Sequence, residues 1–257
     1  MTQPGLKALL LDLDDTLLGN SMDTFIPAYF GALKDFVSHL VPGEEFIVQL
    51  LSATRLMTTN DGTGATNEEV FTEAFYPSFD VERRELEPVL EDFYRAAFPK
   101  LQPLTQPRAA APLIIEWAQE RGLQVVIATN PLFPRTAIEQ RMAWGGVGVD
   151  RFAYDRVTTY ENSRATKSHP AYYHEILAAL GRRPGECVMV GDNWGWDVEQ
   201  AVGAGISGFW IADGGERPPD AATPFLGQGN LDDFFALAEN GHLDERLRRL
   251  VDGRAGR

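Results

Sequence analysis

Apolar residues along the chain form short uninterrupted runs, separated by stretches in which apolar positions recur with helical spacing. The runs lie at residues 5–11, 123–128, 187–190 and 207–211. None of them alternates with polar positions, and strands covered on both faces of a parallel sheet show this pattern. Helical patterns, each closed by a glycine, lie at residues 112–120, 135–144 and 171–180. This alternation predicts an α/β fold with a doubly wound, Rossmann-like parallel sheet.

The segment between residues 21 and 103 departs from the alternation because it contains helical patterns and no convincing strand. We predict helices at residues 26–39, 44–54, 68–75 and 81–98. Pro88 is expected to kink or split the last of these helices, and Thr66 with Glu69 fits the capping box that opens a helix. The sequence therefore predicts a core made of residues 1–20 and 104–257, with residues 21–103 inserted as a helical cap.

Two further segments have a distinctive composition. Residues 56–65 are rich in threonine, asparagine and glycine, which predicts a long polar loop and a candidate functional loop. Near the C-terminus, one helix is predicted at residues 231–239, and an arginine-rich segment follows. We expect that segment to be a solvated surface helix that frays at its end.

The net charge narrows the range of partners. The formal net charge is −14, with only four lysines among 257 residues. An acidic surface repels nucleic acid and anionic membranes, which argues against a polyanionic partner. The single cysteine, Cys187, excludes an intrachain disulfide and is expected to be a buried apolar residue. The apolar run near the N-terminus is too short for a signal peptide or a membrane span, so we expect a soluble cytoplasmic protein.

Polar groups that can carry chemistry follow the predicted strands, where open parallel sheets build their sites. Asp12 and Asp14 lie two residues apart at a strand end, so one carboxylate can attack phosphorus while the other handles protons. Thr16 follows in the turn, where its hydroxyl is expected to orient Asp14. Asp192 and Asp197 follow another strand, and clustered carboxylates require a hard cation, for which Mg²⁺ fits.

A second group of residues is suited to binding phosphate. Thr129 and Asn130 end the second strand and can offer a hydroxyl and amides to phosphate oxygens. Lys167 opens a predicted helix, and its ammonium can screen the repulsion between a carboxylate and a phosphate dianion. Each of these motifs alone is also typical of an ordinary turn or surface loop. Their joint occurrence at strand ends favours a single catalytic site.

The order of these motifs resembles that of the haloacid dehalogenase (HAD) superfamily. Leu10-Leu11-Asp12-Leu13-Asp14-Asp15-Thr16-Leu17 is similar to its first motif, and Thr129, Lys167 and Gly191-Asp192…Asp197 are similar to the second, third and fourth. The chain departs from the usual pattern at Ser168, where the family has proline, and at Gln200, where glycine is common. The helical insert between the first two motifs resembles the cap of the phosphoglycolate-phosphatase-like branch.

The resemblance implies a role for each matching residue. Asp12 would be the nucleophile, and Asp14 would protonate the leaving oxygen and later activate water. Thr129, Asn130 and Lys167 would hold the phosphoryl oxygens. Mg²⁺ would be held by Asp12, Asp192 and the Asp14 backbone carbonyl, with Asp197 supporting the site. By position, Arg55, Thr59 and Asn60 correspond to a cap loop that contacts substrate.

The sequence leaves several functions open. The main expectation is a Mg²⁺-dependent phosphohydrolase that acts on a small phosphorylated metabolite through an aspartyl-phosphate on Asp12. Dehalogenases and phosphonatases of the superfamily lack a second carboxylate at the position of Asp14, which disfavours both. A sugar phosphomutase would keep all four motifs and stays open. A phospho-accepting signalling domain and a non-catalytic binding relative are disfavoured alternatives. The leaving group, and the choice between monomer and homodimer, stay undetermined.

Overall fold

A parallel sheet forms the centre of the computed structural model, which describes residues 5–212, 216–220 and 222–255. The strand order is β5-β4-β1-β6-β7-β8, and every neighbouring pair is parallel. The strands are β1 (Ala8–Leu11), β4 (Gln124–Ile127), β5 (Arg156–Val157), β6 (Cys187–Gly191), β7 (Ser207–Ile211) and β8 (Gly227–Gly229). The four uninterrupted apolar runs are thus the four central strands, which confirms the predicted α/β fold.

Alternate residues of the central strands face two different helical layers. Leu9 and Leu11 pack in one apolar cluster with residues of α5 (Ala110–Glu120), α6 (Arg135–Trp144) and α9 (Leu231–Glu239). Ala8 and Leu10 pack in a second cluster with residues of α7 (Pro170–Leu180) and α8 (Gln200–Gly203). Successive side chains of a strand point to opposite faces. A strand between two helical layers therefore needs apolar residues at every position, as the sequence indicates.

Two short strands of this sheet, β5 and β8, were not predicted. Each has only two or three residues, too few for a periodic pattern to be visible. A separate antiparallel pair, β2 (Leu18–Gly19) with β3 (Gln106–Pro107), was missed for the same reason. This pair brings together the two ends of the helical insert.

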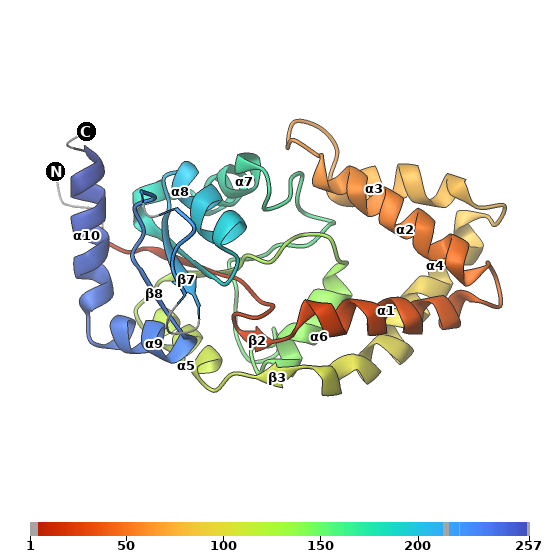
Figure 1. Ribbon diagram of the computed structural model, residues 1–257, viewed down its shortest axis with the longest axis horizontal. Helices are drawn as coiled ribbons and strands as arrows, with labels where there is room; N and C mark the ends of the chain where they lie inside the picture. Colours follow the sequence, from red (N-terminus) through yellow and green to blue (C-terminus); the bar gives the residue numbers. More distant parts are fainter. Residues whose placement is uncertain (1–4, 213–215, 221, 256–257) are drawn as a thin grey trace.

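The insert between β2 and β3 is helical and lies to the right of the sheet in Figure 1. Its elements are α1 (Met22–Val37), α2 (Gly43–Thr58), α3 (Asn67–Phe75), the 3₁₀ turn η1 (Tyr76–Ser78), α4 (Arg83–Asp92), the π-helical η2 (Phe93–Ala97) and the 3₁₀ helix η3 (Phe98–Leu104). The capping box of Thr66 and Glu69 is confirmed at the start of α3.

The boundaries within the insert differ from the prediction at two places. Helix α2 continues to Thr58, so the long loop predicted at 56–65 begins only at Thr59. Pro88 does not split the fourth helix, because α4 passes through it. A proline removes one helical N–H donor, and burial of Leu86 and Phe93 holds the helix against the other elements. The helix changes its winding at Phe93 instead.

The C-terminal segment is more buried than predicted. Helix α10 (His242–Ala255) follows α9, and its Leu243 and Leu247 are fully buried in the main apolar cluster. The predicted helix is present, but it is not a fully solvated one, because these two leucines, four residues apart, form an apolar stripe among the arginines. The predicted fraying of its end stays a prediction. The last two residues lie outside the described part of the chain. Among the described residues, none of the helices is long and apolar enough to span a membrane.

Candidate active site

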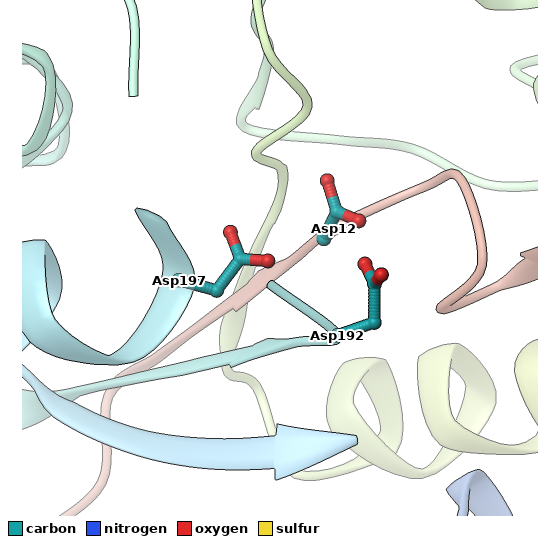
Figure 2. Close-up of side chains that lie close together, drawn as sticks. All are labelled: Asp12, Asp192 and Asp197. Carbon is teal, nitrogen blue, oxygen red and sulfur yellow. The ribbon is translucent and has the colours of Figure 1, made fainter. Parts of the chain in front are cut away.

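Three carboxylates meet at the C-terminal ends of β1 and β6, as Figure 2 shows. One oxygen from each of Asp12, Asp192 and Asp197 lies within 4.8 Å of the others. The backbone N–H of Asp12 donates to the Val190 carbonyl oxygen at 2.9 Å, which ties the two strand ends together. Parallel pairing therefore joins residues that are almost two hundred positions apart in the sequence.

The approach of Asp197 depends on the absence of a side chain at Gly191. A Cβ added at Gly191 would lie 2.2 Å from Asp197 Oδ2, far inside van der Waals contact. Asp197 sits in a π-helical turn, η5 (Trp194–Glu199), and its Oδ2 accepts the backbone N–H of Asn193 at 3.0 Å. The glycine and this bond together orient the Asp197 carboxylate toward the centre of the site.

Lys167 forms ion pairs with two of these three carboxylates. Its Nζ donates to Asp12 Oδ1 and, at 2.7 Å, to Asp197 Oδ1. The side chain is only 2% exposed. Burial opposes the positive charge, but the carboxylates of Asp12 and Asp197 outweigh burial and raise the pKa of Lys167 above its usual value. The lysine is therefore charged at any physiological pH.

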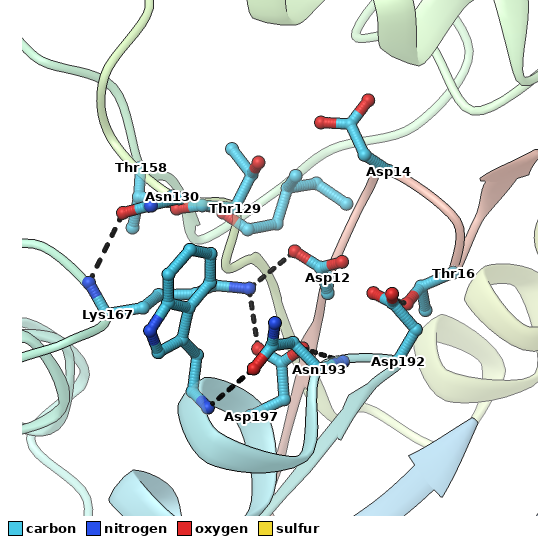
Figure 3. Close-up of polar contacts among 12 residues, drawn as sticks. Asp12, Asp14, Thr16, Thr129, Asn130, Thr158, Lys167, Asp192, Asn193 and Asp197 are labelled. Carbon is cyan, nitrogen blue, oxygen red and sulfur yellow. Dashed lines mark hydrogen bonds and ion pairs between the residues drawn. The ribbon is translucent and has the colours of Figure 1, made fainter. Parts of the chain in front are cut away.

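Thr129 and Asn130 lie beside Lys167, as the sequence indicates (Figure 3). The Thr129 carbonyl oxygen accepts from Thr158 Oγ1 at 2.7 Å and from the Tyr172 hydroxyl at 2.9 Å. Asn130 Oδ1 accepts the backbone N–H of Lys167 at 3.3 Å. These bonds fix the strand-end turn against the segment that carries Lys167.

Asp14 has partners that the sequence did not indicate. Arg141 of α6 donates through Nη1 to both carboxylate oxygens of Asp14, at 2.9 and 3.1 Å, and is itself only 1% exposed. Asn20 Nδ2 donates to Asp14 Oδ1 at 2.9 Å. In Figure 3 the Asp14 carboxylate points away from Asp12 and Lys167. An arginine is almost never fully buried without a partner, so the burial of Arg141 points to an ion pair. The sequence could not indicate this pair, because the burial of Arg141 is known only from the structure.

Thr16 differs from the expectation that it orients Asp14. Its hydroxyl donates to Asp192 Oδ1 at 3.4 Å instead. The turn between Asp14 and Thr16 explains this difference. Asp15 adopts a left-handed backbone conformation with φ of 54°, and its Oδ1 accepts the Asn20 N–H at 2.9 Å. The chain reverses at Asp15, and Thr16 then faces the end of β6.

The buried carboxylates repel one another. Burial, together with the neighbouring Asp12 and Asp197, raises the pKa of Asp192 to about 8. Burial also raises the pKa of Asp12 and of Asp14, although Lys167 and Arg141 oppose the shift. Such a group of oxygen ligands in mutual repulsion fits a hard divalent cation such as Mg²⁺. Among the described residues the cluster consists of Asp12, Asp192 and Asp197. The Asp14 carboxylate is outside it, so a share in metal binding through the Asp14 backbone carbonyl stays a prediction.

The three residues predicted for the cap loop have an exposed position or local contacts in the structure. Arg55 is exposed on α2, and Thr59 Oγ1 donates to the Leu56 carbonyl oxygen at 2.8 Å. Asn60 Nδ2 donates within the loop, to Ala65 O at 3.0 Å and to Asn67 Oδ1 at 2.9 Å. These contacts shape the loop itself, and a role in contacting substrate stays a prediction.

The first residue of α3, directly after this loop, attaches the insert to the core. The Asn67 backbone N–H donates to Ser163 O at 2.8 Å, and its side-chain Nδ2 donates to Pro131 O at 3.2 Å and Ala165 O at 3.3 Å. Pro131 follows Asn130, and Ala165 precedes Lys167 by two residues. The insert is thus anchored on the segments that carry the second and third motifs.

Comparisons with known proteins agree with this architecture. The model of the haloacid dehalogenase-like hydrolase family matches residues 6–205. A phosphoserine phosphatase of Thermus thermophilus is 31% identical over 260 residues, covering 91% of this chain and 99% of the relative. Pyrophosphatase PpaX of Bacillus velezensis is 26% identical over 215 residues, covering 82% of this chain and 86% of the relative.

Solved structures share the fold. The HAD phosphatase of Thermococcus onnurineus has a TM-score of 0.56 at 22% identity, with 90% of this chain and 97% of that chain covered. The 2-haloacid dehalogenase of Pseudomonas syringae pv. Tomato has a TM-score of 0.63 at 18% identity, with 92% and 99% covered. The chain therefore belongs to the haloacid dehalogenase-like hydrolase family, and it is a HAD-like phosphatase.

Proposed function

We propose that this chain hydrolyses a small phosphomonoester through a covalent aspartyl-phosphate on Asp12, with Mg²⁺ as its cofactor. The observation that carries the proposal is the buried Lys167 ammonium between Asp12 and Asp197, with Asp192 in the same carboxylate cluster. A carboxylate beside a buried cation is poised to attack an anionic phosphorus centre, because the cation reduces the repulsion.

The proposed reaction has two displacements. In the first, an Asp12 carboxylate oxygen bonds to phosphorus, the bond from phosphorus to the leaving oxygen breaks, and the Asp14 carboxyl gives that oxygen a proton. In the second, Asp14 takes a proton from water, whose oxygen attacks phosphorus, and the bond to Asp12 breaks. Inorganic phosphate leaves and both carboxylates return to their first state.

Two further groups of residues support these steps. Thr129, Asn130 and Lys167 are proposed to hold the phosphoryl oxygens. Asp12, Asp192 and the Asp14 carbonyl are proposed to hold Mg²⁺, with Asp197 supporting them. When bound, Mg²⁺ supplies charge neutralisation at the phosphoryl group.

Burial raises the pKa of the Asp14 carboxyl, which favours the protonated form that the first displacement needs. To reach the leaving oxygen, the Asp14 side chain must rotate from its contacts with Arg141 and Asn20.

The helical insert, residues 21–103, is proposed to act as a cap that excludes water and selects the leaving group. Relatives named for phosphoserine and for pyrophosphate favour a small phosphorylated metabolite as the substrate. The acidic surface argues against a nucleic acid polymer or an anionic membrane as a partner. The protein is also proposed to be cytoplasmic and to act as a monomer or homodimer.

The test is phosphate release from p-nitrophenyl phosphate and from a panel of natural phosphomonoesters, with Mg²⁺ and with EDTA. We expect metal-dependent turnover that Asp12→Asn abolishes, while the exposed Asp80→Asn variant keeps wild-type rates. Mass spectrometry of acid-quenched protein should show phosphate on Asp12. Turnover that persists in Asp12→Asn would refute the covalent mechanism. Transfer of phosphate to a sugar phosphate in preference to water would indicate a mutase instead.

A further inference from the structure

The inserted helices and the core enclose a cavity of about 740 Å³. On the insert side its lining includes Tyr29, Phe71 and Tyr76. On the core side it includes residues 132–134 and 160–161. Cavities that hold small organic ligands have volumes of this order.

The residues that line the cavity do not include the proposed catalytic residues, but two connections link its wall to that site. Its core wall begins at Leu132, two residues after Asn130. The Phe133 ring lies 4.6 Å from the guanidinium carbon of Arg141, and Arg141 binds Asp14. A phosphoryl group at Lys167 and a leaving oxygen near Asp14 would therefore direct the leaving group toward this cavity.

Two buried oxygens on the cavity wall have no hydrogen-bond donor among the described residues. They are Oε2 of Glu161 and Oε1 of Gln140. Glu161 Oε1 accepts the Arg135 backbone N–H at 2.8 Å, and Gln140 Nε2 donates to the Tyr94 carbonyl oxygen at 2.7 Å. Each side chain is thus held by one end, and the oxygen at its other end is unpaired but has almost no accessible surface. Buried acceptors without partners are costly, so a rotation of either side chain toward a ligand donor in the cavity would relieve this cost.

The cavity wall carries an excess of negative charge, because four glutamates and one arginine, Arg95, line it. Glu68, Glu91 and Glu161 line the cavity, and within the described chain none of them forms an ion pair. Arg95, which lines the cavity, pairs with Asp92, and Arg83 pairs with the lining residue Glu87. Burial and the nearby Glu161 raise the pKa of Glu68, which shows that these carboxylates lie in each other's field. An additional cation would relieve this repulsion.

Aromatic rings complete the wall. Tyr76 and Tyr160 line the cavity, and burial raises the pKa of both, with further contributions from Glu87 for Tyr76 and from Glu161 for Tyr160. The Arg83 guanidinium carbon lies 5.0 Å from the centroid of the Tyr76 ring, so one cation already contacts this ring. The faces of tyrosine and phenylalanine rings attract cations, and cages of such rings recognise organic ammonium groups. Apolar rings with acceptors and carboxylates therefore complement an apolar body that carries a positive charge.

We infer that this cavity receives the leaving group of the substrate and that the leaving group is an apolar alcohol bearing a cationic nitrogen. The phosphate end binds at Lys167, and the nitrogen end binds near Glu161 and Glu68. The inference rests on the proposed phosphatase function and adds the chemical class of its substrate.

Three aryl phosphates of nearly equal shape test the charge preference. They are 4-(2-aminoethyl)phenyl phosphate, which is cationic at its far end, 4-propylphenyl phosphate, which is neutral, and 4-(2-carboxyethyl)phenyl phosphate, which is anionic. We expect kcat/KM to decrease in that order. The amine should exceed the propyl ester by about tenfold or more, the value of one charge-assisted hydrogen bond. Equal values for the three esters, or a preference for the carboxylate, would overturn the inference while leaving the phosphatase proposal in place.

Matched variants test which carboxylates cause the preference for the cationic ester. Glu161→Gln keeps an oxygen for the Arg135 N–H but removes the charge, so the ratio of amine to propyl kcat/KM should fall about tenfold. Glu73→Gln, on the same helix as Glu68 but exposed and outside the cavity, should leave the ratio unchanged. If Glu161→Gln does not fold, Glu68→Gln provides the same test. An unchanged ratio in a folded Glu161 or Glu68 variant would overturn the inference. Release of phosphate from none of the three esters, nor from p-nitrophenyl phosphate, would overturn the phosphatase proposal and this inference together.

Discussion

Removal of the Lys167 ammonium is the most informative single change. Lys167→Met keeps most of the apolar stem and deletes the charge that separates Asp12 from Asp197. At the 2.7 Å distance from Nζ to Asp197 Oδ1, a dielectric of about 20 gives an attraction of roughly 6 kcal/mol. Desolvation of the lysine offsets part of this, and loss of one partner of a buried pair costs about 3–5 kcal/mol.

Two measurements follow from this magnitude. The free energy of unfolding, from urea titrations in EDTA, should fall by about 3–5 kcal/mol, and Mg²⁺ should restore part of the loss. In the reaction, loss of one fixed positive group facing the phosphoryl oxygens should lower kcat by about 10²–10³-fold. Phosphate release at saturating substrate measures this effect.

The control for this variant is Lys100→Met, which removes an exposed lysine and should change neither quantity. A folded Lys167→Met protein that keeps kcat within a factor of ten would refute the assignment of Lys167 to the phosphoryl site. Wild-type stability in EDTA would show that the carboxylates protonate without cost, and the electrostatic reasoning would then fail.

Three other predictions concern the same centre. Gly191→Ala places a Cβ against Asp197, so we expect about 1–3 kcal/mol of destabilisation and weaker Mg²⁺ binding, measured by urea titration and calorimetry; unchanged metal affinity would contradict the close approach. Arg141→Met frees the Asp14 carboxyl, whose pKa should rise without the guanidinium, so the pH profile of kcat should move to higher pH; an unmoved profile would show that Arg141 does not act on Asp14. The pKa of Asp192 is raised from 3.8 to about 8 in the folded protein, so metal-free stability should fall as pH rises through this interval. Mg²⁺ should suppress that fall, and urea midpoints between pH 5 and 8.5 that do not change in EDTA would argue against it.

Much of the core could be predicted from the sequence for a local reason. A strand buried on both faces must be apolar at every position, so β1, β4, β6 and β7 were visible as uninterrupted runs. Parallel strands place their C-terminal ends at one edge of the sheet, so Asp12, Thr129 and Asp192 were expected to lie together. Edge strands β5 and β8 escaped prediction because a few residues at the side of a sheet carry no periodic signal.

The partners of individual side chains were decided by the tertiary structure. Arg141 reaches Asp14 across 127 positions of sequence, and its helix shows nothing unusual in composition. Thr16 pairs with Asp192 and not with Asp14 because the left-handed residue Asp15 reverses the chain. Such choices depend on side-chain directions after packing, which residue spacing alone does not specify.

The sequence by itself determined the fold class, the position of the helical insert and the residues that converge at the strand ends. These follow from apolar periodicity and from strand direction, which are local properties of the chain. Only the tertiary structure decided that Gly191 admits Asp197, that the insert and core enclose an acidic, aromatic cavity, and that α10 packs on the core. These features arise where distant segments meet, and their energies depend on distances and burial that exist only in the folded chain.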